Sequence, residues 1–294
     1  MSRPVSEIPV SERAVTQAGV EERAIITLRL LAADAVERAG SGHPGTAIAL
    51  APLGYVLFHD ELRHDPADPD WSNRDRVVLS AGHAAILLYG ALHLTGYDLP
   101  LSEIKRFRRW GSRAPGHPER AVTAGIDLTT GPLGQGLGNA VGLALSERHL
   151  AARFNRPGYP IVDHRTYAIC SDGDMMEGVT SEASSLAGHL QLGRLCVLYD
   201  DNRITIEGET DLAFSEDVGS RYEAYGWDVR RLSDGWTPDD LREQLRLARQ
   251  DERPTLVVVR THIAHGAPTK QDQAEAHGAP LGADEVRALK AHYG

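Results

Sequence analysis

The sequence predicts an α/β fold in which helices cover both faces of a parallel sheet. In its second half, short apolar runs rich in β-branched residues alternate with stretches of helical periodicity, the pattern of repeated strand–helix–strand units. Strands joined in this way run parallel and are buried on both faces. The 294 residues show no internal repeat, low-complexity tract or Pro/Ser-rich linker, so we expect one large domain with a substantial core.

The first half of the chain is predicted to be mainly helical. Residues 1–20 have weak periodicity and are expected to form a loose or partner-bound arm ahead of a single domain over residues 21–294. Apolar residues at helical spacing predict a helix over residues 21–39, which Gly40 and Gly42 end. A strand is expected over residues 77–79 and a helix over residues 84–94. Residues 98–130 are expected to mix short helix and loop. A glycine-rich turn at residues 131–138 then opens a long helix that ends near residue 154.

Strands and helices alternate regularly in the second half. The strands are expected over residues 166–170, 195–199, 227–231 and 255–260. The helices are expected over residues 176–190, 217–225 and 238–250, with a tail helix around residues 284–292. Ligands bind beyond the carboxyl ends of the strands in an open parallel sheet, so the residues that follow each strand are the first candidates for a site.

The composition disfavours several classes of partner. The formal net charge is −10 and the sequence pI is near 5.7. Such a surface repels nucleic acid and anionic membranes, so we expect neither as a partner. No apolar run reaches membrane-spanning length, and residues 1–20 do not resemble a signal peptide. Cys170 and Cys196 lie in apolar runs that are expected to be buried strands, which favours inert thiols and a reducing, cytoplasmic location.

Polar residues follow two of the predicted strands. Asp172 and Asn202 are thirty residues apart, about the length of one strand, one crossover helix and the next strand, so they should lie side by side at one edge of the sheet. Their hard oxygen ligands suit Mg²⁺ or Ca²⁺, and Mg²⁺ usually completes its shell with phosphate oxygens and water. Gly173 would allow a phosphate to approach the backbone, and a helix beginning near Met176 would direct its N-terminal dipole at the same place. This segment alone fits either a diphosphate bridged by Mg²⁺ or ordinary polar caps on strand–helix turns.

Eight short segments carry the strongest functional signal. In chain order they are residues 41–45, 75–83, 115–119, 130–136, 172–178, 199–208, 223–227 and 277–282, which read SGHPG, DRVVLSAGH, PGHPE, TGPLGQG, DGDMMEG, YDDNRITIEG, EAYGW and HGAPLG. Asp-Gly at 172–173 followed by Asn202 resembles the thiamine diphosphate motif. Together, and in this order, the segments resemble the N-terminal, diphosphate-binding domain of the transketolase family. The resemblance implies the thiamine diphosphate-binding fold.

The resemblance also implies a role for each matching residue. Asp172, Asn202 and the backbone carbonyl of Ile204 match metal ligands, for Mg²⁺ or Ca²⁺. The residues that match contacts to thiamine diphosphate are His83, Gly131, Leu133, Gly173, Asn202 and His277. The catalytic residues implied are His43, His117 and His277, which match histidines that bind the donor's hydroxyls or relay protons. Glu177 matches a carboxylate at the subunit contact.

Simpler interpretations compete with these roles, and the sequence departs from the family in places. A loop histidine can be hydrogen-bonded to loop backbone, and Glu177 can be an ordinary first-turn acid favoured by the helix dipole. Ser171 replaces the first glycine of the usual motif, and residues 269–276 differ from the family's common run. His262 and His265 stand where aliphatic or aromatic residues are more common. The shape of the substrate channel therefore stays open.

The resemblance implies an enzyme that is incomplete in this chain. A transketolase is roughly twice this long, and its other part carries the pyrimidine-binding domain, the glutamate that activates the aminopyrimidine and most of the groups that hold the substrate's phosphate. We therefore expect the diphosphate-binding subunit of a two-chain transketolase, which moves a two-carbon ketol unit from a ketose phosphate to an aldose with Mg²⁺ and thiamine diphosphate. It would be active only with its partner subunit, in an assembly with two copies of each chain.

Other interpretations remain open at this point. The start at Met1 favours a separately encoded half, although a piece of a longer chain would look the same. A subunit of another thiamine diphosphate enzyme that acts on an unusual sugar would share these motifs. So would a non-catalytic binding or regulatory subunit with the same fold, although the retained metal-ligand residues and loop histidines argue against it.

Overall fold

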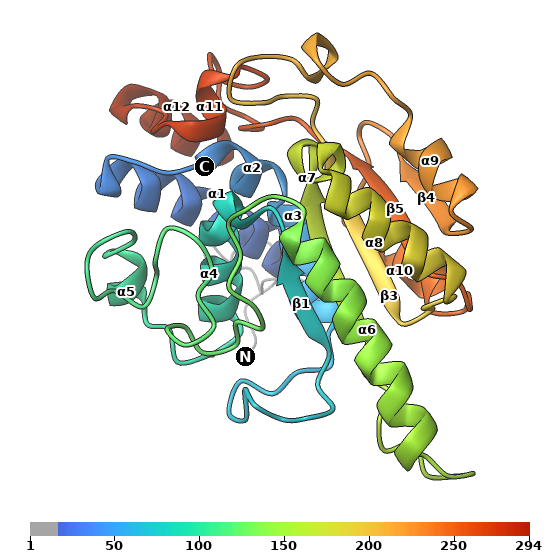
Figure 1. Ribbon diagram of the computed structural model, residues 1–294. Helices are drawn as coiled ribbons and strands as arrows, with labels where there is room; N and C mark the ends of the chain where they lie inside the picture. Colours follow the sequence, from blue (N-terminus) through green and yellow to red (C-terminus); the bar gives the residue numbers. More distant parts are fainter. Residues whose placement is uncertain (1–16) are drawn as a thin grey trace, which may run out of the picture.

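The predicted parallel sheet is confirmed. In the computed structural model, which describes residues 17–294, five parallel strands form one sheet in the order β1-β2-β3-β5-β4 (Figure 1). The strands are β1 (Arg76–Leu79), β2 (Thr166–Ser171), β3 (Leu195–Asp201), β4 (Asp228–Leu232) and β5 (Thr255–Arg260). The register pairs Ser171 with Asp200, so the residues that follow β2 and β3 emerge side by side at the carboxyl edge. A parallel sheet binds its ligands at this edge.

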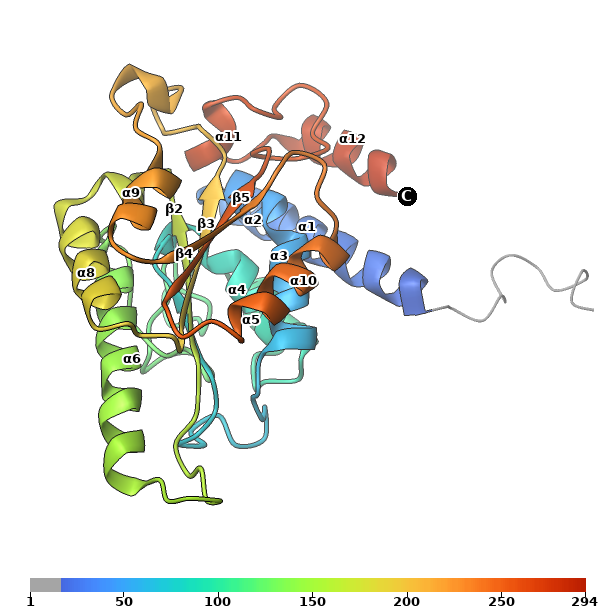
Figure 2. The same cartoon turned by 90° about the vertical axis from the view of Figure 1, so that its right-hand side faces the viewer.

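Helices cover both faces of the sheet, as predicted (Figure 2). One face carries α6 (Gln135–Phe154), α8 (Gly178–His189) and α9 (Val218–Ala224), and the other carries α1 (Gln17–Ala39), α4 (Ala85–Leu94) and α10 (Pro238–Ala248). Alternate residues of β2 enter two separate cores: Tyr167 and Ile169 pack on the α1 side, and Ala168 and Cys170 pack on the α6 side. Both faces of the strand are buried, which explains its continuous apolar sequence.

A buried helical segment was missed by the sequence analysis. Residues 44–61, for which no element was expected, form α2 (Pro44–Ala49), α3 (Ala51–Val56) and the π-helical turn η3 (Leu57–Glu61). Every residue of α2 is buried. A helix that is apolar all round has no amphipathic stripe, so its sequence shows no helical period. The segment matters for function because His43 is the residue that precedes α2.

Two predicted helix starts differ from the structure. α1 begins at Gln17 rather than Glu21, and the rest of the expected arm, residues 1–16, lies outside the described residues. The helix predicted over residues 176–190 is two helices, α7 (Asp172–Met176) and α8, separated by Glu177 in an extended conformation (φ −73°, ψ 136°). The start near Met176 was therefore wrong, because Ser171 and Asp174 form a capping box that begins α7 directly after β2.

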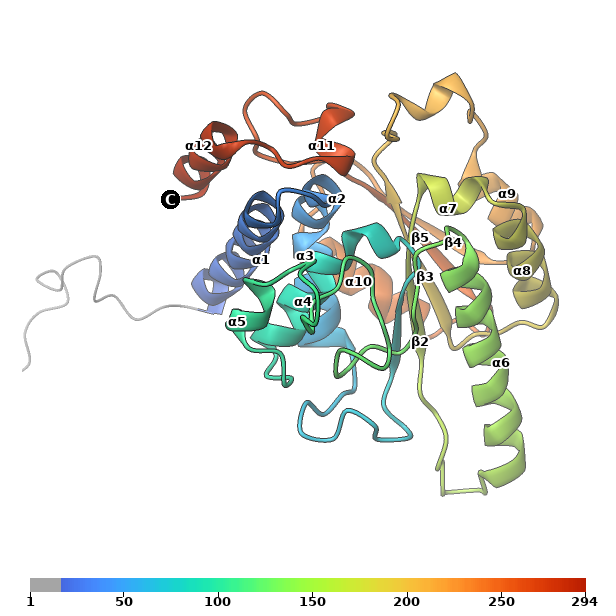
Figure 3. The ribbon, with the colours of Figure 1, turned by 60° about the vertical axis from the view of Figure 1, so that its left-hand side comes forward.

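The C-terminal tail folds back on the first helix. α12 (Ala283–Tyr293) lies along α1 (Figure 3), and Lys290 Nζ is 2.7 Å from Asp34 Oδ1. The short helix α11 (Glu275–Gly278) precedes it and packs against α2. The remaining short elements are η4 (Gly82–Ala84), α5 (Leu101–Ile104) and η5 (Thr210–Leu212). Within residues 17–294, no helix is long and apolar enough to cross a membrane.

Candidate functional site

A cavity of about 380 Å³ lies at the carboxyl edge of the sheet. Its walls come from the start of α2, the turn after β1, the glycine-rich loop before α6, α7, the loop after β3, and α11. The predicted site residues that line it are His43, His83, Gly131, Leu133, Asp172, Gly173, Asn202, Ile204 and His277. The tenth, His117, lies behind them, with its ring centroid 6.4 Å from that of His43. Segments spread over the whole chain thus converge on one cavity.

Asp172 is a buried carboxylate on the wall of this cavity. Its Oδ1 accepts a hydrogen bond from the hydroxyl of Tyr199 (2.5 Å), and its Oδ2 accepts one from the backbone N–H of Arg203 (3.0 Å). Burial raises the pKa of Asp172 to about 6, and the hydrogen bond from Tyr199 opposes that rise. In the described part of the chain no lysine or arginine forms an ion pair with it. A divalent cation in the cavity would favour its charged form.

Asn202 is fixed by hydrogen bonds on both sides of its amide group. Its Nδ2 donates to Asp200 Oδ2 (2.7 Å), and its Oδ1 accepts from the backbone N–H of Ile204 (2.8 Å). Arg203 between them has a left-handed backbone (φ +63°), which is uncommon for a residue with a side chain and costs about 1 kcal/mol. The amide oxygen keeps a second lone pair, so it can still bind a cation.

Asp200 is a site residue to which the sequence analysis gave no role. Its side chain is fully buried, and it accepts hydrogen bonds from Asn202 Nδ2 and from the hydroxyl of Thr261 on the segment after β5. Burial raises the pKa of Asp200 to about 7. Asp200 therefore orients the amide of Asn202. The sequence has two adjacent aspartates, Asp200 and Asp201, and nothing in it indicates which of the two side chains is buried.

Asp174 is a second residue whose role was missed. Its carboxylate is fully buried and accepts hydrogen bonds from Ser80 Oγ (2.6 Å), the Gly134 N–H (2.7 Å) and both the N–H and the hydroxyl of Ser171 (2.9 and 3.1 Å). It ties the turn after β1 and the glycine-rich loop to the start of α7. The Ser-x-x-Asp spacing at 171–174 is a capping-box signal that could have found it.

The substitution of serine for the usual glycine at position 171 is accommodated without strain. Ser171 has φ −118° and ψ 176°, which is extended backbone that any residue adopts. Its hydroxyl takes part in the capping box, so the serine stabilises the start of α7. A Cβ at position 173 would lie 2.8 Å from Leu133 Cδ1, so the end of the Leu133 side chain would have to move. Leu133 of the glycine-rich loop thus packs against the backbone of Gly173 on this wall of the cavity.

Four histidines predicted from four separate motifs form one cluster. The ring centroid of His43 lies 5.2 Å from that of His83 and 5.7 Å from that of His277, and the rings of His83 and His277 are 4.9 Å apart. Burial lowers the pKa of each, that of His43 to about 4 and that of His83 well below its usual value. The imidazoles are therefore neutral at pH 7, able both to donate and to accept a hydrogen bond.

Three of these rings have a buried nitrogen without a protein partner. The atoms are His43 Nδ1, His83 Nε2 and His277 Nδ1, which make no hydrogen bond within residues 17–294. Buried polar atoms are nearly always hydrogen-bonded, so unpaired ones lining a cavity point to a polar ligand. For these three residues, the observation disfavours the simpler interpretation of a histidine hydrogen-bonded to loop backbone.

The two histidines that depart from the family pattern lie outside this cavity. His262 is hydrogen-bonded to Asp272 (2.8 Å) and to Asp234 (3.0 Å), which raises its pKa despite partial burial. His265 contacts Arg29 of α1 and the hydroxyl of Tyr293 in α12. Both stabilise the segment between β5 and α11. Neither histidine lines the cavity, so these two departures from the family pattern do not alter its wall.

Comparison with known sequences and structures agrees with this geometry. The family described as "Transketolase, thiamine diphosphate binding domain" matches residues 20–294. The chain is 55% identical over 274 residues to the transketolase of Halalkalibacterium halodurans, covering 93% of this chain and 41% of that protein. It is also 55% identical over 275 residues to the transketolase of Geobacillus stearothermophilus, with the same coverage.

Solved structures give the same result. The transketolase of Leishmania mexicana superposes with a TM-score of 0.90 at 48% identity, covering 93% of this chain and 41% of that one. A Pichia stipitis transketolase in complex with sedoheptulose 7-phosphate superposes with a TM-score of 0.91 at 48% identity, covering 93% and 40%. The family match and the fold define a thiamine diphosphate-binding domain. The chain belongs to the transketolase family, and it spans about two-fifths of the length of the relatives it matches.

Proposed function

We propose that this chain supplies the diphosphate-binding half of a transketolase, which transfers a two-carbon ketol unit from a ketose phosphate to an aldose. The observation that carries the proposal is a single cavity with three kinds of polar lining. These are the buried carboxylate of Asp172, the oriented amide of Asn202, and the three histidines with unpaired ring nitrogens. A magnesium-bound diphosphate fits the first two groups, and a polyhydroxylated substrate fits the histidines.

The residues present fit a magnesium ion and thiamine diphosphate. Asp172, the amide oxygen of Asn202 and the carbonyl of Ile204 would hold the ion, and His83 and the backbone at Gly173 would contact the diphosphate. In the described residues, no three His, Cys, Asp or Glu side chains converge as a metal-binding group. The protein's ligands alone therefore do not fill an octahedron, and diphosphate oxygens would complete it. Thiamine diphosphate, when bound, supplies the carbanion chemistry.

The chain's own histidines would handle the sugar. We assign to His43, His117 and His277 the binding of donor and acceptor hydroxyls and the relay of protons. Burial lowers the pKa of all three, so the imidazoles are neutral at pH 7 and can accept a hydrogen bond from a hydroxyl group.

The remaining part of the enzyme would come from a partner. No glutamate of this chain can be assigned to activation of the aminopyrimidine, so we infer a second subunit that carries the pyrimidine-binding and C-terminal domains. Glu177, exposed beside the glycine-rich loop, is our candidate for the subunit contact. We propose an assembly with two copies of each chain, in the reducing cytoplasm, where the two buried thiols of Cys170 and Cys196 would stay free.

A ketol-transfer assay tests this proposal. The purified chain is supplied with saturating Mg²⁺ and thiamine diphosphate and assayed with and without a chain that carries the pyrimidine-binding domain. We expect turnover only with both chains. Turnover by the chain alone would refute the need for a partner. No turnover with both chains, despite coenzyme binding, would favour a non-catalytic subunit or an unusual sugar substrate.

A further inference from the structure

A second polar cavity, of about 400 Å³, lies at the amino edge of the sheet, opposite the candidate site. The walls of this amino-edge cavity come from the second half of α6, the segment that leads into β2, the turn before β3, and the turn between α10 and β5. The two turns pack closely, because a Cβ on Gly193 would lie 2.5 Å from the carbonyl oxygen of Glu252. The end of α6 projects at this edge, on the opposite side from α11 and α12 (Figure 2). The two cavities share no lining residue.

Glu147 of α6 is a buried carboxylate on the wall of the amino-edge cavity. The residue is 4% exposed, and within residues 17–294 its side chain makes no hydrogen bond and no ion pair. Burial raises the pKa of Glu147, although Arg194 and Arg165 are near enough to oppose the rise. A buried polar group without a partner is rare and costs free energy. Glu147 therefore points to a hydrogen-bond donor that the described chain does not supply.

Two arginines of the same lining have no carboxylate partner. Arg165 donates to two backbone carbonyls (3.3 and 2.8 Å), and Arg194 donates to one (3.1 Å). In the part of the chain that the structure describes, neither guanidinium forms an ion pair. Burial lowers the pKa of Arg165, and the nearby charge of Arg194 adds to this effect. An anion in the cavity would stabilise both positive charges.

The other charged residues of the lining do not replace that anion. Asp251 is paired with Arg253 (2.8 Å), and Arg249 is paired with the buried Glu61 (2.6 Å). The two that remain are exposed at the rim: Arg148 and Glu252.

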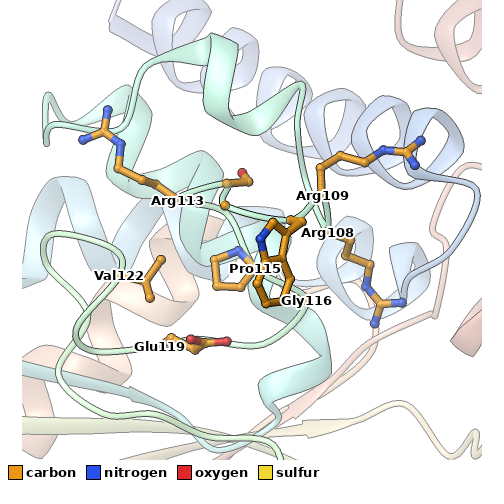
Figure 4. A pocket seen from close by; sticks show the side chains of 10 residues that line it. Arg108, Arg109, Arg113, Pro115, Gly116, Glu119 and Val122 are labelled. Carbon is orange, nitrogen blue, oxygen red and sulfur yellow. The ribbon is translucent and has the colours of Figure 1, made fainter.

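Arginines also line a cavity of about 500 Å³ in the loop that follows α5, but without the same arrangement. The side chains of Arg108, Arg109 and Arg113 spread in different directions there (Figure 4). Arg113 is paired with Asp98 (2.8 Å), and the acidic residue of that lining, Glu119, is exposed. That cavity therefore has no buried carboxylate in need of a donor.

We propose that the amino-edge cavity binds a small phosphate monoester that carries a hydroxyl group. The phosphate lies at the guanidinium groups of Arg165 and Arg194, and the hydroxyl donates a hydrogen bond to Glu147. Planar guanidinium groups suit a phosphate because each can donate two parallel hydrogen bonds. A bare phosphate would leave the Glu147 carboxylate without a donor, so the ligand needs its hydroxyl group as well. Ordered water in the cavity is the competing explanation.

Isothermal titration of the full chain tests this site. Saturating Mg²⁺ and thiamine diphosphate are present, so that the candidate site at the carboxyl edge is occupied. The probes are glycerol 3-phosphate and inorganic phosphate, of which only the first carries hydroxyl groups on carbon. We expect saturable binding of glycerol 3-phosphate, roughly tenfold tighter than that of inorganic phosphate, because a hydrogen bond to a buried carboxylate adds to the phosphate contacts.

Substitutions separate the two ends of the ligand. Arg165→Gln and Arg194→Gln should each weaken the binding of both probes about tenfold or more. Glu147→Gln, which keeps the shape of the side chain, should reduce the preference for glycerol 3-phosphate to less than about threefold. The control is Arg153→Gln, which removes an exposed arginine of α6 outside this lining and should change neither affinity.

Three results would overturn the site. Absence of saturable binding of glycerol 3-phosphate would mean that the cavity holds water only. Affinity that survives both arginine substitutions would place the phosphate elsewhere on the chain. Equal affinity for the two probes, unchanged by Glu147→Gln, would remove the carboxylate from the site. Circular dichroism checks that each variant is folded, and Glu147→Gln, which loses no hydrogen bond, decides the matter if an arginine variant does not fold. The site lies in this chain alone, so failure of the proposed function would leave the result unaffected.

Discussion

Asp200 offers a sharp test of how the amide of Asn202, the proposed metal ligand, is oriented. The substitution Asp200→Asn keeps the volume of the side chain but leaves one oxygen where there were two. Asp200 accepts one hydrogen bond from Asn202 Nδ2 and one from Thr261, and it is fully buried. The asparagine can accept from Asn202 only if its NH₂ group donates to the Thr261 hydroxyl, which must reverse its role, and the charge of the acceptor is lost.

The expected size of the effect follows from the loss of the charged acceptor. Weakening a buried hydrogen bond to a charged group costs about 1–3 kcal/mol. If Asn202 turns to relieve it, the cost appears in coenzyme binding, and we expect affinity for thiamine diphosphate to fall roughly 10- to 100-fold in the presence of Mg²⁺. If Asn202 stays, the cost appears as lower stability of the chain to urea. Isothermal titration of the assembled enzyme and urea unfolding of the chain together capture both outcomes.

The adjacent aspartate provides the matched control. Asp201 is partly exposed, and its side chain lies 3.6 Å from the exposed Arg203. Asp201→Asn makes the same chemical change one residue along the strand and should alter coenzyme affinity less than twofold. Equal effects of the two substitutions on affinity and stability would refute the assignment of Asp200 as the residue that orients Asn202.

The remaining predictions concern the proposed metal ligands and the histidines. Asp172→Ala and Asn202→Leu should each abolish Mg²⁺-dependent retention of the coenzyme, because both residues would bind the same ion. Isothermal titration of the assembled enzyme measures this, and a loss in only one of the two variants would disprove a shared site. His117→Ala and His277→Ala should lower kcat about tenfold to ten-thousandfold and weaken coenzyme binding less, and full activity in both would mark them as structural. The folded-state pKa of His43 is about 4, below the usual 6.5, so the unfolded chain binds a proton that the folded chain does not. Stability should therefore fall as the pH is lowered from 6.5 towards 4, and His43→Gln should reduce the loss between pH 7 and pH 5 by up to about 2 kcal/mol in urea unfolding; an unchanged loss would contradict the lowered pKa.

The sequence predicted the sheet and both of its helical layers because their signals are local. Strands such as β3 and β5 are continuous apolar runs, and α10 follows a Thr-Pro-Asp-Asp start signal that the structure realises as a capping box. Buried α2 was missed for the opposite reason, since a helix enclosed on every side carries no polar face. The helix start was placed near Met176 instead of at Asp172 because the capping box at 171–174 lies inside the Asp-Gly motif, whose residues are also typical of turns.

The candidate site was predictable in its membership but not in its internal contacts. Motif resemblance selected His43, His83 and His277 from distant parts of the chain, and the structure brings their rings together. The inward turn of the Asp200 side chain and the left-handed backbone of Arg203 (φ +63°) follow from no local residue preference. These features form only when the chain folds, so the sequence alone does not predict them.

The most direct test of the account is the position of the metal in the assembled enzyme. Crystals grown with thiamine diphosphate and Mn²⁺ in place of Mg²⁺ would reveal the ion by its anomalous scattering. We predict one ion per site, about 2 Å from Asp172, the amide oxygen of Asn202 and the carbonyl oxygen of Ile204, with diphosphate oxygens completing its shell. An ion bound elsewhere, or a diphosphate that does not contact it, would contradict the central claim.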